Sequence, residues 1–242
     1  VFPHLLTQNI DKNFDAIRST PYGNTITLDL AKLAILSEDL GQDNITDFLA
    51  VSCSSTDYVG HAYGPNSVEL EDTYLRLDQD LEKFFNYLDQ TLGKGNYLFF
   101  LSADHAAAHV PGFMLENKLP AGTVSNSAFR KGLDTLMNKK FNLSKSVITV
   151  MNNQVYFDHS VIDDKKVDFA KVKEEAIKYL RSQNGIADAV DLNILNTSTI
   201  PEEIRKRITN GYNARRSGDV YFLLKANWFD GGSTGTTHGA WY

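Results

Sequence analysis

The chain has 242 residues, and its content of 42% hydrophobic, 22% charged and 11% aromatic residues excludes a disordered, collagen-like or coiled-coil protein. Its 24 basic and 30 acidic residues give a net charge of −6, so we expect no nucleic-acid-binding surface of the general basic kind. No apolar run is long enough to span a membrane, and Cys53 as the single cysteine rules out an intrachain disulfide.

The first hundred residues are predicted to alternate between helices and buried strands. The spacing of apolar residues predicts a helix over 25–40 and a long amphipathic helix over 67–92. The continuous apolar runs 47–53 and 97–101 have the length and composition of strands that are buried on both faces. This alternation predicts an α/β fold with a mostly parallel sheet and helices on both faces.

Residues 106–217 differ in composition from the first hundred residues and are predicted to form a smaller α+β insertion. Residues 146–158 indicate two strands around a turn at Asn152-Asn153. Further elements are expected as helices near 128–138, 164–182 and 201–207 and as a strand over 219–224. We therefore assign 1–105 and 218–242 to the α/β core, and 106–217 to an inserted, cap-like region.

Aspartate and histidine residues follow both predicted core strands and recur in a late loop rich in glycine and threonine. Asp57 and His61 follow the first strand, Asp104 and His105 follow the second, and His238 lies in the loop. A helical turn would place Asp57 and His61 on one face, and sites in such sheets form beyond the carboxyl ends of the strands. Imidazole and carboxylate ligands suit zinc, although spacing alone leaves surface or helix-capping roles open for each residue.

The segments that carry these residues resemble the alkaline phosphatase superfamily. The likeness covers 55–65, 101–105 and 237–239 in the same order along the chain, and it extends upstream to 19–24. The most similar branch is that of the bacterial phosphate-irrepressible alkaline phosphatases and the type I phosphodiesterases/nucleotide pyrophosphatases. This resemblance implies a three-layer alkaline phosphatase-like fold with a site for two zinc ions.

The resemblance also implies a division of roles among the site residues. Asp57, His61 and His238 would hold the first zinc, while Asp104 and His105 would contribute to the second, incomplete zinc site. The family further needs an aspartate and a Thr or Ser nucleophile from an N-terminal segment, and neither motif occurs in this chain. We therefore expect a fragment that contains no catalytic nucleophile and is inactive by itself.

The expected function of the intact protein is the zinc-dependent hydrolysis of phosphate monoesters through a phospho-enzyme. Its expected partners are a small phosphate-ester substrate and the missing N-terminal part of the same protein. The resemblance implies a periplasmic or secreted location. Two alternatives stay open: a phosphodiesterase or nucleotide pyrophosphatase, and a non-catalytic metal-binding scaffold.

Overall fold

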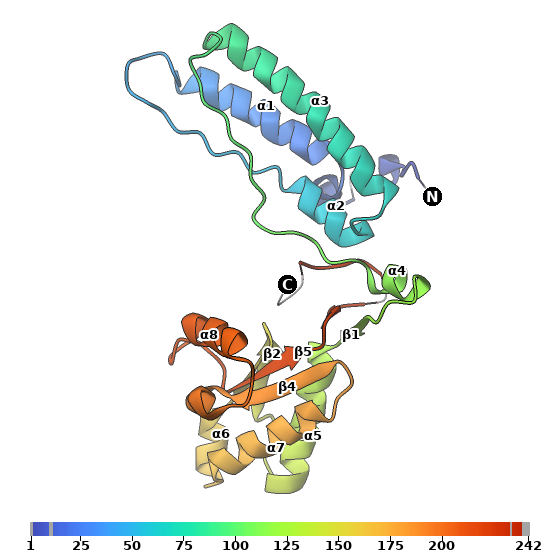
Figure 1. Cartoon of the computed structure of the whole chain (residues 1–242), viewed down its shortest axis with the longest axis vertical. Helices are drawn as coiled ribbons and strands as arrows, with labels where there is room; N and C mark the ends of the chain where they lie inside the picture. Colours follow the sequence, from blue (N-terminus) through green and yellow to red (C-terminus); the bar gives the residue numbers. More distant parts are fainter. Residues whose placement is uncertain (1, 10–11, 233, 239–242) are drawn as a thin grey trace. The chain divides into compact units, whose positions relative to one another are not determined.

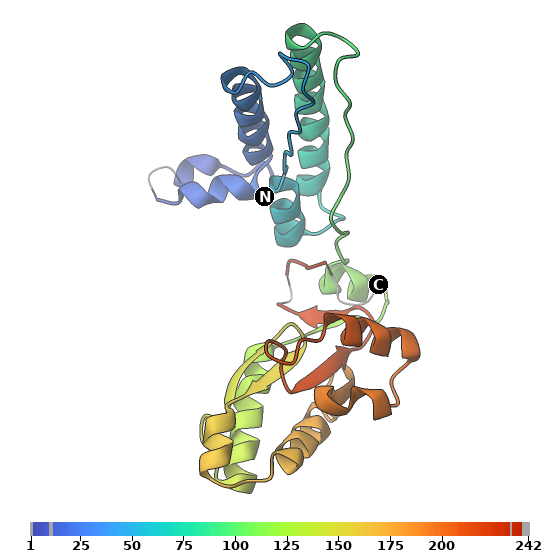
Figure 2. The same cartoon turned by 90° about the vertical axis from the view of Figure 1, so that its left-hand side faces the viewer.

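The computed structural model describes residues 2–9, 12–232 and 234–238, and the chain divides into two compact units. The first unit comprises the described residues up to Leu119 together with 234–238. The second unit comprises 120–232. Figures 1 and 2 show the elements of each unit in two perpendicular views. None of the helices in these described ranges combines the length and apolar character needed to cross a membrane.

The first unit is helical in its regular elements. These are the short 3-10 helices η1 (Leu6–Asn9) and η2 (Phe14–Ser19) and the α-helices α1 (Tyr22–Ser37), α2 (Ser55–Tyr63), α3 (Val68–Thr91) and α4 (Pro111–Glu116). Helices α1 and α3 run side by side (Figures 1 and 2), and α2 packs against both. The apolar stripe of α1 meets that of α3 in a buried cluster formed by Leu28, Ala31, Ile35, Phe84 and Leu88.

Both helices predicted in this region are confirmed. The long helix α3 begins where predicted because Ser67 caps it, its side chain accepting a hydrogen bond from the backbone N–H of Leu70. Helix α1 begins three residues earlier than expected and ends at Ser37 rather than at residue 40. Such shifts at helix ends are usual, because terminal turns depend on local capping more than on apolar spacing.

The two strands predicted at 47–53 and 97–101 are wrong for the described structure. Neither run contains a strand, and their large side chains are exposed: Phe48 to 79% and Leu98 to 91%. A β-strand requires a hydrogen-bonded neighbour, and no described residue pairs with either run. The apolar pattern reports a tendency to be buried, but it carries no information on whether a partner strand is present.

The second unit contains a four-stranded antiparallel sheet in the order β2-β3-β5-β4 and a separate parallel pair, β1 with β6. The strands are β1 (Gly122–Val124), β2 (Val147–Met151), β3 (Gln154–Phe157), β4 (Ile186–Asp191), β5 (Val220–Leu224) and β6 (Trp228–Asp230). The helices are α5 (Asn126–Phe141), α6 (His159–Asp164), α7 (Phe169–Arg181), η3 (Leu192–Thr197) and α8 (Glu202–Gly211).

Strand β5 is buried on both faces of this sheet. Phe222 and Leu224 belong to the main core, which α5 and α7 cover, whereas Leu223 packs on the opposite face with residues of η3 and α8 (Figure 1). The strand is therefore continuously apolar although its sheet is antiparallel. The expected hairpin is also present, with Asn152 and Asn153 both at positive φ (50° and 61°) in the turn that joins β2 to β3.

Other elements of the second unit depart from expectation. The helix predicted over 164–182 is present as α7 but begins only at Phe169: the separate helix α6 ends at Asp164, and Lys166 between them adopts a φ of 54° that no helix continues through. Strand β4 and the short strands β1 and β6 were not expected. The predicted strand at 219–224 is confirmed as β5 and lies in the second unit. The assignment of core and insertion stays a prediction.

Candidate metal centre

Helix α2 places Asp57 and His61 on one face. It occupies Ser55–Tyr63, so the helical turn on which their pairing depends is formed, and residues four apart lie one above the other. Asp57 Oδ2 lies 3.4 Å from His61 Nε2, and the two side chains are 42% and 33% exposed. A metal ion in solution can therefore reach both side chains, whose backbone positions are set by α2.

His238 completes a group of three potential ligands. One ligand atom from each of Asp57, His61 and His238 lies within 4.8 Å of the others. The His238 ring stands edge-on to that of His61, with ring centroids 4.9 Å apart. The structure therefore brings together the three residues that the sequence analysis assigned to one zinc, although they are separated by up to 181 positions in the chain.

Asp104 and His105 lie beside this group. His105 Nε2 is 3.9 Å from Asp57 Oδ1 and 3.5 Å from Asp104 Oδ2, and the His105 ring centroid is 3.9 Å from that of His238. Asp104 is largely open to solvent, with 87% of its side chain exposed. All five predicted site residues thus gather in the first unit.

The orientation of His61 is fixed by the loop that carries His238. His61 Nδ1 lies 2.7 Å from the backbone oxygen of Thr236, and the Thr236 N–H donates to the His61 oxygen at 2.9 Å. An imidazole that donates through Nδ1 has its free lone pair on Nε2, the atom that faces Asp57. This is the usual arrangement of a histidine that ligates a metal, with one nitrogen anchored and the other available.

The same loop is also bonded to the segment after His105. The Thr236 hydroxyl donates to the Ala108 oxygen at 2.7 Å, and the Ala108 N–H donates to the Thr237 oxygen at 2.8 Å. Residues 236–237 therefore connect α2 on one side with the chain that follows Asp104 and His105 on the other. Sequence reasoning missed this role, since the groups involved are mostly backbone atoms that every residue carries.

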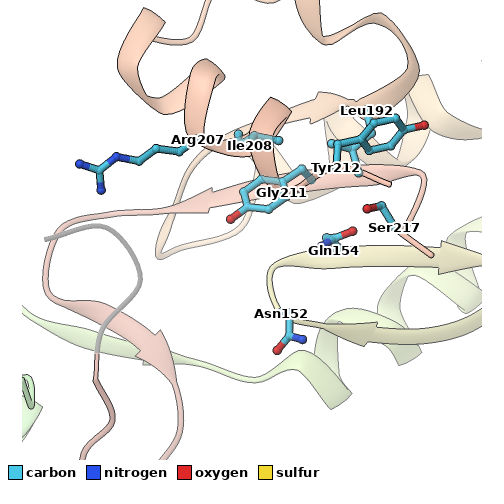
Figure 3. A pocket seen from close by; sticks show the side chains of 9 residues that line it. Asn152, Gln154, Leu192, Arg207, Ile208, Gly211, Tyr212 and Ser217 are labelled. Carbon is cyan, nitrogen blue, oxygen red and sulfur yellow. The ribbon is translucent and has the colours of Figure 1, made fainter. Parts of the chain in front are cut away.

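The second unit contains a cavity of a different kind, shown in Figure 3. It has a volume of about 180 Å³ and lies between the end of α8, the β2–β3 turn and β5. Its lining consists of Asn152, Gln154, Leu192, Arg207, Ile208, Gly211, Tyr212, Ser217 and Tyr221. Because this lining includes no carboxylate, imidazole or thiol, the cavity offers none of the usual protein ligands for zinc. The group in the first unit is the better candidate site.

Comparison with known proteins assigns the chain to a family. A profile of the type I phosphodiesterase/nucleotide pyrophosphatase family matches residues 6–241. The chain belongs to this family. Among characterised members of related sequence, the alkaline phosphatase PhoV of Synechococcus elongatus is 55% identical over 240 residues, which cover 99% of this chain and 43% of PhoV.

Another relative of this phosphodiesterase-family chain has a solved crystal structure. The alkaline phosphatase PafA of Elizabethkingia meningoseptica is 44% identical over 242 residues, or 99% of this chain and 44% of PafA. The crystal structure of wild-type PafA matches with a TM-score of 0.89, covering 98% of this chain and 46% of that one. These matches confirm the resemblance to the alkaline phosphatase superfamily and the expected α/β fold class of that superfamily, with both a parallel and an antiparallel sheet in the described residues. The chain spans less than half the length of these relatives.

Proposed function

We propose that this chain supplies the metal-binding half of a phosphate-ester hydrolase, with phosphate monoesters as its first substrate class. The observation that carries the proposal is the convergence of Asp57, His61 and His238 within 4.8 Å. Support comes from the family match and from the relatives PhoV and PafA, both named as alkaline phosphatases.

The donor set fits zinc. One carboxylate and two imidazoles are ligands that Zn²⁺ prefers, and three protein ligands leave a position open, as catalytic zinc sites require. Tetrahedral ligands at normal zinc distances lie about 3.3 Å apart. The 3.4 Å between Asp57 Oδ2 and His61 Nε2 matches this spacing, and all the ligand pairs are within about 1.5 Å of it.

Asp104 and His105 would hold a second zinc together with ligands that this chain does not supply. They provide two of the four ligands of a tetrahedral site, and they lie next to the first group. We propose that the remaining ligands, and the Thr or Ser that forms the phospho-enzyme, belong to a part of the longer protein outside this chain. The proposal is consistent with the chain covering less than half of PhoV and PafA.

The charges of the site support metal dependence. Asp57 and Asp104 present two carboxylates where an anionic phosphate ester would bind, and these would repel it. Bound divalent cations would supply the opposite charge, polarise the phosphoryl oxygens and neutralise the charge that develops during transfer. The chain's own residues hold and orient the cations: Thr236 fixes the His61 ring, and the exposed Asp57 leaves the substrate side open.

The nearby threonine hydroxyls serve structural roles in this proposal. The Thr56 hydroxyl accepts a hydrogen bond from Asn24, and the Thr236 hydroxyl donates to the Ala108 oxygen. Neither is therefore assigned as the attacking group. We infer that the chain alone shows little turnover and binds zinc more weakly than the full-length protein. Zinc titration by calorimetry tests this, and two tight, equal sites in the chain alone would contradict it.

The experiment that tests the function is a hydrolysis assay of the full-length protein with aryl phosphate monoesters and diesters. We expect preferential cleavage of the monoester, loss of activity with a chelator and recovery with zinc. His61→Ala should reduce activity by at least tenfold. His159→Ala, which changes an exposed histidine of the second unit, should leave activity unchanged.

The alternatives give different results in the same assay. The family name favours a phosphodiesterase or nucleotide pyrophosphatase, which would prefer the diester. Full-length protein that is inactive on both esters with zinc supplied would overturn the proposal and favour a non-catalytic metal-binding scaffold. A periplasmic or secreted location is part of the proposal, and cell fractionation of the native host tests it.

A further inference from the structure

Asn24 is a buried polar residue whose side chain reaches the helix that carries two candidate metal ligands. It lies in the first turn of α1 and is only 1% exposed. Its Nδ2 group donates to the Thr56 hydroxyl oxygen at 2.9 Å, across 32 positions of the chain. Thr56 directly precedes Asp57, so this hydrogen bond ends on the residue next to a candidate ligand.

The first turn of α2 depends on such contacts because it lacks a side-chain cap. Ser54 occupies the N-cap position but forms no capping hydrogen bond, and the helix is only nine residues long. Short helices without caps are held mainly by tertiary packing. The segment that begins α1 provides it: a Cβ added at Gly23 would lie 2.0 Å from Ser55 Oγ, so the α1 backbone approaches α2 as closely as a glycine allows.

The amide at position 24 has a cost for folding. Asn24 Oδ1 is buried and has no hydrogen-bond partner among the described residues. Burying an unpaired carbonyl oxygen is unfavourable, and an aliphatic side chain of similar size would avoid it. The packing stability of α1 therefore does not explain why residue 24 is an asparagine. The hydrogen bond to Thr56 explains it, because this bond positions the turn that contains Asp57.

We propose that Asn24 is a positioning residue for the metal ligand Asp57. It acts by fixing the first turn of α2, so that the Asp57 carboxylate faces His61 Nε2 one turn later in the same helix. The inference rests on the proposed metal site. It adds to that site a residue from α1 that no spacing rule connects with the ligands.

The test compares metal binding and stability in the full-length protein. Asn24→Leu removes both polar atoms of the amide at similar volume, and Thr56→Val removes the other end of the same bond. Both variants should weaken the first-site affinity for Zn²⁺ and Co²⁺ by about tenfold, the lower end of the range for residues that orient ligands. Asn24→Leu should leave the melting temperature of the metal-free protein unchanged or higher.

A spectroscopic readout and two reference variants make the test specific. The visible absorption of bound Co²⁺ reports ligand geometry, and His61→Ala identifies which binding step belongs to the first site. Thr73→Val is the matched control, since it removes a fully buried hydroxyl of α3 that donates within its own helix. The double variant Asn24→Leu/Thr56→Val should bind no more weakly than either single variant.

Two results would overturn the inference, and they are distinguishable. Wild-type metal affinity in Asn24→Leu and Thr56→Val, or a loss equal to that of Thr73→Val, would show that Asn24 has no positioning role while the metal site stands. Unchanged metal binding in His61→Ala would instead refute the site itself, and the role of Asn24 with it.

Discussion

Gly235 provides a sharp test of how the late loop supports the metal centre. It adopts a φ of +77°, and a Cβ added there would lie 2.8 Å from the backbone oxygen of His61. That oxygen already accepts the Thr236 N–H, so the loop and the end of α2 are in direct contact at this point. Gly235→Ala should therefore push apart the loop that bears His238 and the helix that bears His61.

The size of the effect can be worked out from two contributions. A non-glycine residue at such a φ costs about 1–2 kcal/mol. Relieving the contact with a backbone oxygen adds about 1–3 kcal/mol, as in other overpacked sites. Gly95→Ala isolates the first contribution, because Gly95 has a φ of +90° but nothing within 4 Å of an added Cβ. Gly235→Ala should thus destabilise more than Gly95→Ala does.

The decisive measurement is zinc affinity, determined in the full-length protein by competition with a chromophoric chelator. Gly235→Ala should weaken binding by about tenfold or more, because it disturbs the carbonyl that orients His61. Gly95→Ala should bind zinc with wild-type affinity. Thermal unfolding of both metal-free variants measures how much each substitution destabilises the fold. Equal zinc affinity in the two variants would refute the reasoning that the loop positions the site.

Two further predictions concern the ion pairs and carboxyl groups of the fold. Asp191→Asn should lower the free energy of unfolding by about 3 kcal/mol, because it removes the negative charge that lies 2.7 Å from the buried Lys173 ammonium. Glu174→Gln at an exposed pair should change the free energy of unfolding little, and chemical denaturation measures both. Burial raises the pKa of Asp80, but the hydrogen bond from Thr25 contributes to a net lowering of this pKa. The ionised Asp80 therefore stabilises the fold at pH values above its unfolded-state pKa. This stabilisation is lost as the pH falls through the folded-state pKa. Thr25→Val should accordingly lower the melting temperature at about pH 6 more than at about pH 2, and an equal loss at both values would contradict the assignment.

The elements that sequence reasoning predicted well carry their own signals. Helix α3 has an amphipathic pattern and a serine cap, and the β2–β3 hairpin has two asparagines suited to positive φ. The runs 47–53 and 97–101 failed because a strand is a property of two chain segments, while apolar character belongs to one.

The same distinction applies to the candidate site. The four-residue spacing of Asp57 and His61 predicted their proximity, because residues four apart in a helix lie on the same face. His238 was a candidate because it lies in a loop rich in glycine and threonine, but its assignment to the same zinc as Asp57 and His61 came from the family resemblance, since no local rule links residues so far apart. The Thr236 carbonyl had no detectable signal, because a backbone oxygen is present at every position. Asn24 lies in the upstream segment 19–24 that resembles the family, but nothing in the sequence indicates that its amide bonds to Thr56.

The parallel pairing of β1 with β6 has a consequence for how this chain can diversify. Gly122 lies opposite Trp228, so the points where the chain enters and leaves the second unit are held side by side. The path from His105 to His238 is thereby shortened roughly fivefold, which reduces its closure entropy by about 1.4 kcal/mol. The segment between β1 and β6 can therefore change in sequence or length without lengthening the path between His105 and His238. As long as β1 and β6 stay paired, the effective chain length between these two histidines remains the same.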